Sequence, residues 1–404
     1  MKSRSIPREK FRIPIADRMT RLPPYLLGKV NTLKQEKRRQ GVDVIDLGMG
    51  NPNDPPPGEV LEKIAEAVRD PRNHRYSVSR GIVNLRREVA AYYRRTWGVT
   101  LDGEKEVVCC VGSKEGFSHL CLALLGPGDT ALVPSPAYPI HDCSIMLAGA
   151  NVIRIPLGTD DKFIASVSDV AKNLYPHPRL LVINFPHNPT ASTVDVAFFE
   201  EIVKVAKRRG FLVVHDFAYG EINFDGYKSP SFLQARGARD VGVELTTMSK
   251  TFSMPGWRIG YCSGNREMIR ALSDIKSYYD YGIFQAIQIS AIVALRRCEP
   301  YKRVISGVYQ RRRDVLIDGL NRIGWKVEKS RASMFVWVPI PEPHRKAGSV
   351  AVAMKMLDEA HVAVFPGLGF GEEGEGHIRI ALVENEERLR QAVRQIKKVF
   401  PVKE

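Results

Sequence analysis

The feature of this sequence that most constrains its fold is an alternation of short apolar runs with helical-looking stretches between about residues 58 and 290. The apolar runs are Val107–Val111, Ala131–Val133, Asn151–Ile155, Leu180–Asn184, Leu212–His215, Leu245–Met248 and Ile259–Ser263. Helical patterns cover 58–69, 81–97, 114–125, 138–148, 166–173, 196–209 and 265–295. Strands that alternate with helices in this way are typical of an α/β fold with a mostly parallel sheet. Such sheets bind ligands at the carboxyl ends of their strands, so the residues directly after these runs are the candidates for a functional site.

Changes in this pattern divide the chain into three predicted parts. Residues 1–55 are expected to form an N-terminal arm and part of a small domain, with a helix at 25–39 and a strand at 42–47. The three consecutive prolines 55–57 cannot continue a helix or a central strand, and they mark a boundary. Residues 56–295 are expected to form a large domain, and the α+β pattern of 296–404 a smaller C-terminal domain. The elements expected in that last part are helices at 301–320, 348–359 and 386–399 and strands near 333–338, 362–364 and 377–383.

The chain has a formal net charge of +15, from 60 Lys and Arg against 45 Asp and Glu. A nucleic-acid-binding protein concentrates such charge in a stripe or tail, whereas the basic clusters here are short and lie in separate helical stretches. No apolar stretch approaches the ~20 residues that span a bilayer. We therefore expect neither a membrane nor a nucleic-acid partner. Weak nucleic-acid binding stays open as an alternative, which binding at low and raised salt would test.

Composition and cysteine usage indicate a cytoplasmic protein. Apolar residues make up 44% and charged residues 26% of the chain, as in an ordinary globular protein. The six cysteines form no C-x-x-C motif, and several lie in apolar runs, as buried free thiols do. The basic start of the chain is followed by no apolar stretch of the kind found in secretory signals. These features together predict a reduced, cytoplasmic chain.

The strongest chemical signal is the segment Thr247-Met-Ser-Lys250-Thr-Phe-Ser-Met-Pro-Gly-Trp-Arg258. Lys250 follows an apolar strand, and a lysine amine in a dry pocket can form a Schiff base with a carbonyl compound. Thr247, Ser249 and Arg258 add hydroxyl groups and a planar guanidinium, which together suit a phosphate. From the residues alone, a lysine on the surface is the alternative.

Other candidate residues follow the remaining strands. Asp216 ends the run Leu212–His215, and Asn188 lies in a Pro-rich turn where the Asn188–Pro189 bond is a candidate for the cis form. Gly112 precedes Ser113 at a predicted helix start, where free N–H groups favour an anion. Taken singly, each has a structural explanation as a cap, a turn or a solvated helix end.

Together these motifs, in their order and spacing over roughly residues 20–400, resemble the class I and II aminotransferases, which depend on pyridoxal 5′-phosphate. The stretches Arg21–Tyr25, Tyr76–Gly81, Gly112–Gly116 and Lys276–Gly282 are most similar to the bacterial glutamate–pyruvate (alanine) aminotransferases of that family. The resemblance implies fold type I, in which helices flank a mostly parallel seven-stranded sheet beside a smaller α+β domain. It also implies an enzyme that moves amino groups between amino acids and 2-oxo acids.

The resemblance assigns residues to the cofactor ring. It implies that Lys250 carries pyridoxal phosphate covalently and moves the substrate proton, which makes it the predicted catalytic residue. Asp216 is implied to pair with the ring nitrogen and keep it protonated, so that the ring acts as an electron sink. Tyr219 and Asn188 are implied to bond to the 3′ oxygen, and Tyr138 to stack on the ring.

Further positions follow from the same resemblance. The residues implied to bind the phosphate are Ser113, Lys114, Thr247, Ser249 and Arg258. Tyr76 matches a tyrosine that reaches the phosphate of the neighbouring subunit, which implies a homodimer with shared sites. Arg379 matches the arginine that grips the substrate α-carboxylate in a bidentate fork, and Gly50 approaches the same carboxylate. No metal is implied.

The side chain of the substrate is less determined. Aspartate aminotransferases hold the second carboxylate with an arginine near the helix after the lysine segment, whereas residues 276–284 contain none. Asp280 in this segment is expected to repel such a carboxylate, and Arg21 is the candidate to hold it. The resemblance favours L-alanine with pyruvate and L-glutamate with 2-oxoglutarate. LL-diaminopimelate, aspartate or aromatic transamination, a lyase that shares the cofactor, and a ligand-sensing regulator built on this fold are the alternatives, although residues 1–55 leave no room for a DNA-binding domain.

Overall fold

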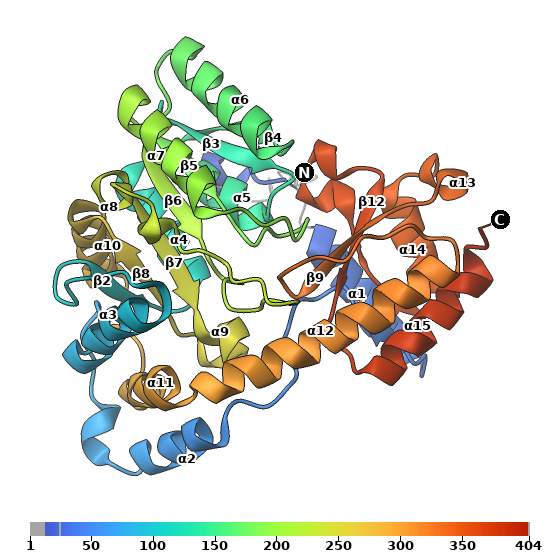
Figure 1. The fold of residues 1–404 in the computed structure, drawn as a ribbon, viewed down its shortest axis with the longest axis horizontal. Helices are drawn as coiled ribbons and strands as arrows, with labels where there is room; N and C mark the ends of the chain where they lie inside the picture. Colours follow the sequence, from blue (N-terminus) through green and yellow to red (C-terminus); the bar gives the residue numbers. More distant parts are fainter. Residues whose placement is uncertain (1–12, 24–25, 403–404) are drawn as a thin grey trace, which may run out of the picture.

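A seven-stranded sheet forms the centre of the computed structural model, which describes residues 13–23 and 26–402 (Figure 1). The strand order is β2-β8-β7-β6-β5-β3-β4. The strands are β2 (Val107–Cys110), β3 (Thr130–Ser135), β4 (Asn151–Pro156), β5 (Leu180–Ile183), β6 (Leu212–Asp216), β7 (Gly242–Thr247) and β8 (Gly260–Gly264). Strand β8 runs antiparallel to both of its neighbours, and all other pairs are parallel. The predicted α/β class and mostly parallel sheet are confirmed.

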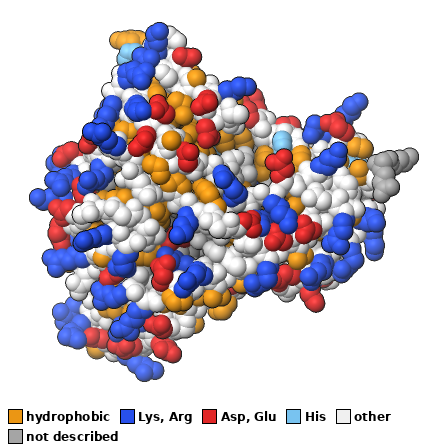
Figure 2. All heavy atoms as spheres, in the orientation of Figure 1, with side chains coloured by type: hydrophobic (Ala, Val, Ile, Leu, Met, Phe, Trp, Pro, Cys, Tyr) orange, Lys and Arg blue, Asp and Glu red, His pale blue; other side chains and the backbone are white. Residues whose placement is uncertain are grey.

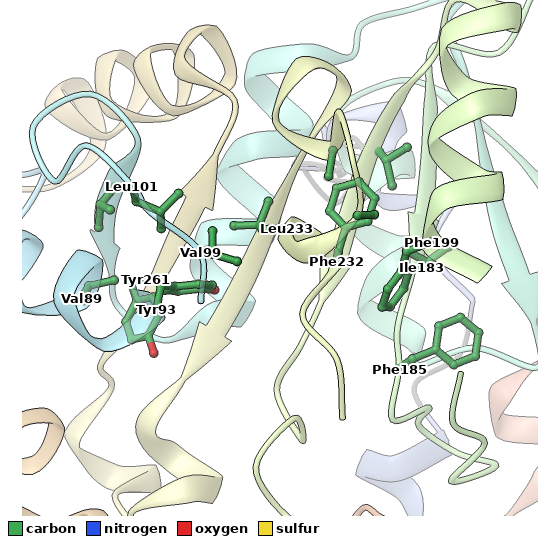
Figure 3. Packing of buried hydrophobic residues seen from close by; sticks show 14 of the residues in the cluster. Val89, Tyr93, Val99, Leu101, Ile183, Phe185, Phe199, Phe232, Leu233 and Tyr261 are labelled. Carbon is green, nitrogen blue, oxygen red and sulfur yellow. The ribbon is translucent and has the colours of Figure 1, made fainter. Parts of the chain in front are cut away.

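Helices cover both faces of this sheet, and each face has its own apolar core. Because side chains alternate along a strand, Leu181 and Val213 enter one core, whereas the next residues Val182 and Val214 enter the other. Figure 3 shows part of the first core, where Phe199 lies near Phe232. The helices of this region are α2 (Gly58–Ala67), α3 (Val83–Trp97), α4 (Ser113–Leu124), α5 (Pro139–Leu147), α6 (Asp160–Asn173), α7 (Val196–Arg209), α8 (Ala238–Val241), α9 (Met248–Thr251), α10 (Arg266–Tyr279) and α11 (Gln285–Arg297).

Two predicted helices differ from the structure. The helix expected over 265–295 is two helices, because the chain turns between α10 and α11 at Gly282, whose φ of +83° favours glycine. The helix expected at 166–173 begins earlier, at Asp160. Acidic residues in a first helical turn are favourable for the helix dipole, and Phe163 starts the buried face of α6 that continues at Val167.

The C-terminal part, drawn in orange and red in Figure 1, lies beside the central sheet and has a sheet and a core of its own. Its sheet has the antiparallel order β11-β12-β9, and it packs on a core that includes Trp325 and Tyr309. Residues near the N-terminus join this part, because β1 pairs in parallel with β10. The elements are α1 (Leu26–Arg39), β1 (Ile45–Asp46), α12 (Glu299–Arg322), β9 (Phe335–Pro339), α13 (Glu342–Arg345), α14 (Ser349–Glu359), β10 (Val362–Ala363), β11 (Phe365–Pro366), β12 (His377–Ala381) and α15 (Glu386–Val399).

The surface carries its basic residues without a dense stripe on the visible face. Figure 2 shows Lys and Arg side chains interspersed with Asp and Glu over both parts of the molecule. All six cysteines are free thiols. Within the described ranges, no helix combines the length and the apolar character that crossing a membrane would require.

Candidate active site

A cavity of about 400 Å³ opens where β6 and β7 end, and it brings together almost every predicted site residue. Its lining includes Gly50, Ser113, Lys114, Tyr138, Asn188, Asp216, Tyr219, Thr247, Ser249, Lys250, Arg258 and Arg379. Tyr76 is the predicted residue that lies elsewhere. The parallel strands place their carboxyl ends on one edge of the large sheet, and Gly50 and Arg379 reach the same cavity from the smaller C-terminal part.

Lys250 lies in the short helix α9, directly after β7. Its Nζ donates a hydrogen bond of 2.6 Å to the carbonyl oxygen of Gly50. Burial first, and then the positive charges of Arg379 and Arg258, lower the pKa of the Lys250 amine from 10.5 to about 7. A neutral amine is the nucleophilic form of lysine, so this environment prepares Lys250 to react with a carbonyl group near neutral pH.

Asp216, the last residue of β6, has a carboxylate group that is held by one contact to each of its oxygens. Its Oδ2 lies 3.0 Å from Nε2 of His141, and its Oδ1 accepts from the backbone N–H of Ala218 at 3.3 Å. His141 is 1% exposed, and its other ring nitrogen has no partner among the described residues. A buried carboxylate fixed in this way can pair with a protonated ring nitrogen on its open side.

A chain of polar contacts connects Tyr219, Asn188 and Arg379. The amide nitrogen of Asn188 lies 3.5 Å from the hydroxyl oxygen of Tyr219, and its amide oxygen accepts from Arg379 Nη1 at 2.7 Å. The Asn188–Pro189 bond is cis, as predicted. Burial raises the pKa of Tyr219, so its hydroxyl stays protonated and can donate.

Arg379 has a buried guanidinium group that can still donate a further hydrogen bond. It lies on β12, with 5% exposure, and its Nη2 donates to the carbonyl oxygen of Gly48 at 3.0 Å. Its Nε has no partner among the described residues. The guanidinium carbon lies 4.0 Å from the ring centroid of Phe335 and 4.7 Å from that of Phe370. A planar cation held between aromatic rings suits a carboxylate, which can accept two parallel bonds from it.

The start of α4 and the segment after β7 form an anion-binding corner, which we call the phosphate cradle (Gly112, Ser113, Thr247, Ser249 and Arg258). Gly112 has a φ of +76°, and a Cβ built on it would lie 2.4 Å from Nη2 of Arg258. The free N–H groups at the start of α4 point at this corner, as they do in helix-terminal phosphate sites. The Thr247 hydroxyl donates to Ser249 Oγ at 2.9 Å, which orients both groups.

Two other predicted residues line the cavity from α4 and α5. Lys114 is an exposed first-turn lysine of α4. Tyr138 precedes α5, and its ring meets that of His141 edge to face at 5.8 Å between centroids. Gly50 supplies the carbonyl bonded by Lys250, and a Cβ on Gly50 would lie 2.6 Å from the Phe335 ring.

Two expectations are corrected by the structure, those for Arg21 and Asp280, whereas the role of Tyr76 in the neighbouring subunit stays a prediction. Arg21 does not line the cavity: its guanidinium donates to the backbone oxygen of Ala150 at 2.7 Å, at the amino end of β4. Asp280 is not a free negative charge, because Lys276 lies 2.9 Å from its Oδ2. Tyr76 is 85% exposed and lies outside the cavity of its own chain.

Three contributors to the site are not evident from the sequence. His141 supports Asp216, yet it lies in an unremarkable helical run, and its only signal is a polar residue that would fall on the buried face of α5. Phe335 on β9 and Phe370, nine residues before Arg379, flank its guanidinium, and nothing local in the sequence marks them.

Comparison with known proteins agrees with this geometry. Residues 42–396 match the family model for class I and II aminotransferases. The chain is 48% identical to a glutamate–pyruvate aminotransferase of Escherichia coli, over 95% of this chain and 93% of that protein. It is 41% identical to an LL-diaminopimelate aminotransferase of Moorella thermoacetica, over 95% and 98% of the two chains. The solved structure of an aspartate aminotransferase from Thermus thermophilus superposes with a TM-score of 0.88 at 28% identity, covering 96% of this chain and all of that one.

The chain therefore belongs to the class I and II aminotransferases. It is an aminotransferase, and its cofactor is pyridoxal 5′-phosphate, as in the rest of this family. The cavity fits that cofactor: it has an anion-binding corner for a phosphate, a buried carboxylate for a ring nitrogen and an amine with a pKa of about 7 for a carbonyl group.

Proposed function

We propose that this aminotransferase exchanges amino groups between L-alanine or pyruvate and L-glutamate or 2-oxoglutarate. The observation that carries the proposal is the 48% identity to a glutamate–pyruvate aminotransferase over nearly the whole of both chains. The absence of an arginine from residues 276–284 also argues against a dedicated aspartate enzyme. The expected repulsion of a second carboxylate by Asp280 is a weaker argument than the sequence suggests, since Lys276 neutralises Asp280.

Pyridoxal phosphate, when bound, supplies a carbonyl group for the amine and an electron sink for the negative charge that develops at the substrate Cα. In our proposal the phosphate cradle and Lys114 hold the phosphate, Tyr138 covers the ring, and Asp216 keeps a proton on the ring nitrogen. The ion pair of Asp216 with the ring is maintained because His141 fixes the carboxylate. Tyr219 and Asn188 donate hydrogen bonds to the 3′ oxygen.

Lys250 is proposed as the base that takes the Cα proton of the amino acid and later returns it. Its lowered pKa supports this role, because a general base works best when its pKa lies near the working pH. Arg379 binds the substrate α-carboxylate and thereby orients the Cα–H bond toward the Lys250 amine. The carbonyl oxygen of Gly50 holds Nζ of Lys250 at 2.6 Å and keeps the amine directed into the cavity.

We also propose that the working form is a homodimer. Exposed aromatic side chains gather around the turn between α10 and α11, and Tyr76 packs on one of them, Tyr281. We call this set the aromatic ridge: Tyr76, Tyr278, Tyr279, Tyr281 and Phe284. Exposed aromatic clusters of this kind are typical of protein–protein contacts. In this proposal Tyr76 reaches the phosphate bound by the partner subunit, which explains why it lies outside its own cavity.

A panel of amino donors at fixed 2-oxoglutarate tests the substrate assignment. We expect kcat/KM to be highest for L-alanine, and lower for L-aspartate by about tenfold, the equivalent of ~1.4 kcal/mol. LL-diaminopimelate is the second candidate donor, because relatives that use it are about 41% identical to this chain. A kcat/KM for LL-diaminopimelate or L-aspartate above that for L-alanine would overturn the proposal.

A further inference from the structure

One lysine is fully buried outside the active-site cavity. Lys276, in the last turn of α10, is 0% exposed. Its Nζ lies 3.0 Å from Oε1 of Glu115 and 2.9 Å from Oδ2 of Asp280. A lysine is almost never fully buried unless it is paired, so these two carboxylates account for its burial.

The first carboxylate, that of Glu115, lies two residues after Ser113 of the phosphate cradle. Glu115 lies in the first turn of α4, and its Oε2 accepts a 2.7 Å hydrogen bond from the backbone N–H of Val111. This bond closes the turn that contains Gly112 and Ser113, and Ser113 lines the cavity at the start of α4. Lys276 therefore fixes the glutamate that shapes the cradle.

The second carboxylate, that of Asp280, lies in the chain between Tyr279 and Tyr281 of the aromatic ridge. Oδ1 of Asp280 accepts from the backbone N–H of Gly282 at 2.6 Å, and the Asp280 carbonyl oxygen accepts from the Ser79 hydroxyl at 2.6 Å. These bonds tie the turn after α10 to the segment that carries Tyr76. The Tyr76 ring then packs on that of Tyr281, with 4.7 Å between centroids.

The same corner brings together donor atoms that could hold a metal ion, from Glu115, His119 and Asp280. The ammonium group of Lys276 already bonds to both carboxylates, and Nδ1 of His119 lies 2.5 Å from Glu115 Oε1. The cation that balances the two carboxylates is therefore the lysine itself.

We propose that Lys276 is a positioning residue that couples pyridoxal phosphate binding to dimer assembly. The inference rests on the proposed function, in which Tyr76 completes the site of the partner subunit. In each protomer Lys276 fixes the cradle of its own site through Glu115, and the ridge directed at the other site through Asp280. Loss of Lys276 therefore weakens both cofactor binding and dimerisation. Because coupling between binding events is reciprocal, each of these losses adds to the other.

The test compares Lys276→Met with Lys302→Met. Lys302 is an equally suitable buried lysine, 8% exposed, with Glu221 at 2.6 Å and Glu299 at 2.7 Å, and it does not line the cavity. Pyridoxal phosphate is titrated into the cofactor-free proteins, and the dimer Kd is measured by sedimentation with and without the cofactor. For Lys276→Met we expect both Kd values to rise by about tenfold or more. The KM for L-alanine at saturating cofactor should stay within about twofold, because the substrate does not contact Lys276.

Two milder variants test the two contacts of Lys276 separately, and they also serve as the test if Lys276→Met does not fold. Glu115→Gln is expected to raise the Kd for pyridoxal phosphate more than the dimer Kd, whereas Asp280→Asn should do the reverse. The conservative Lys276→Arg, which keeps the charge, should recover part of both losses.

The inference is overturned if Lys276→Met leaves both Kd values within about twofold of the wild-type protein, or if Lys302→Met raises both as much as Lys276→Met does. A Glu115→Gln protein with an unchanged Kd for pyridoxal phosphate, or an Asp280→Asn protein with an unchanged dimer Kd, would also overturn it. Failure of the proposed function is distinguishable, since it would show in the wild-type protein, as a poor reaction with L-alanine or as a monomer that holds the cofactor.

Discussion

Replacing Arg379 with lysine should cost the enzyme one of the two parallel bonds to the substrate α-carboxylate while keeping the positive charge. The guanidinium is 5% exposed, is held by Asn188 and Gly48, and retains a buried Nε without a partner in the described part of the chain. A lysine ammonium cannot reproduce this planar fork. A charge-assisted hydrogen bond contributes ~1.5–3 kcal/mol, which corresponds to a loss of about 10- to 150-fold in kcat/KM.

The assay is the half-reaction of the cofactor-loaded enzyme with L-alanine, followed by stopped-flow absorbance at several alanine concentrations. The Kd for pyridoxal phosphate should change by less than about twofold, because Arg379 lies outside the phosphate cradle. Arg388→Lys is the matched control, since Arg388 makes a similar two-bond contact to Asp43, with both distances 2.7 Å, at the surface. A kcat/KM for Arg379→Lys within about threefold of the wild-type value, or a loss confined to cofactor binding, would refute the assigned role.

Three further predictions follow from the site. Asp216→Asn should lower kcat by about 100-fold or more, with a Tm within a few degrees of wild type; an unchanged kcat would place Asp216 outside the chemistry. The rate of covalent attachment of pyridoxal phosphate to the cofactor-free enzyme should rise about tenfold per pH unit up to about pH 7 and then level off. The reason is that the pKa of Lys250 is lowered to about 7 and only the neutral amine reacts. A rise that continues to pH 10 would contradict the lowered pKa. Tyr76→Phe should raise the Kd for pyridoxal phosphate about fivefold, the equivalent of one hydrogen bond of ~1 kcal/mol, and no change in this Kd would argue against the shared site.

Much of the large sheet could be predicted because its strands are apolar runs bounded by turns. The run Leu212–His215, for example, becomes β6, and the polar residue after it, Asp216, lies at the cavity as expected. The break between α10 and α11 was missed because the segment Asp280–Phe284 is short and partly aromatic. A single glycine with positive φ is a weak signal for the end of a helix.

The residues that the sequence did not reveal act through contacts between distant segments. His141 becomes functional only because α5 places it against Asp216. The negative charge of Asp280 suggested repulsion of a substrate carboxylate, yet a lysine one helical turn earlier neutralises it. The contact of His141 cannot be read from spacing, since it depends on the direction of a side chain in the folded core. The pair of Lys276 and Asp280 has the i, i+4 spacing of a helical ion pair and could have been predicted.

The central claim, that Lys250 is the residue that carries the cofactor, can be tested by one measurement. The cofactor-loaded protein is reduced with borohydride, digested, and analysed by mass spectrometry for the peptide that bears the pyridoxyl group. We expect the label on Lys250, which lines the cavity and has the lowered pKa, and we expect Lys250→Ala to abolish both the label and the transfer of amino groups. A label on Lys114 or Lys276 instead, or a Lys250→Ala enzyme that turns over L-alanine at close to the wild-type rate, would contradict it.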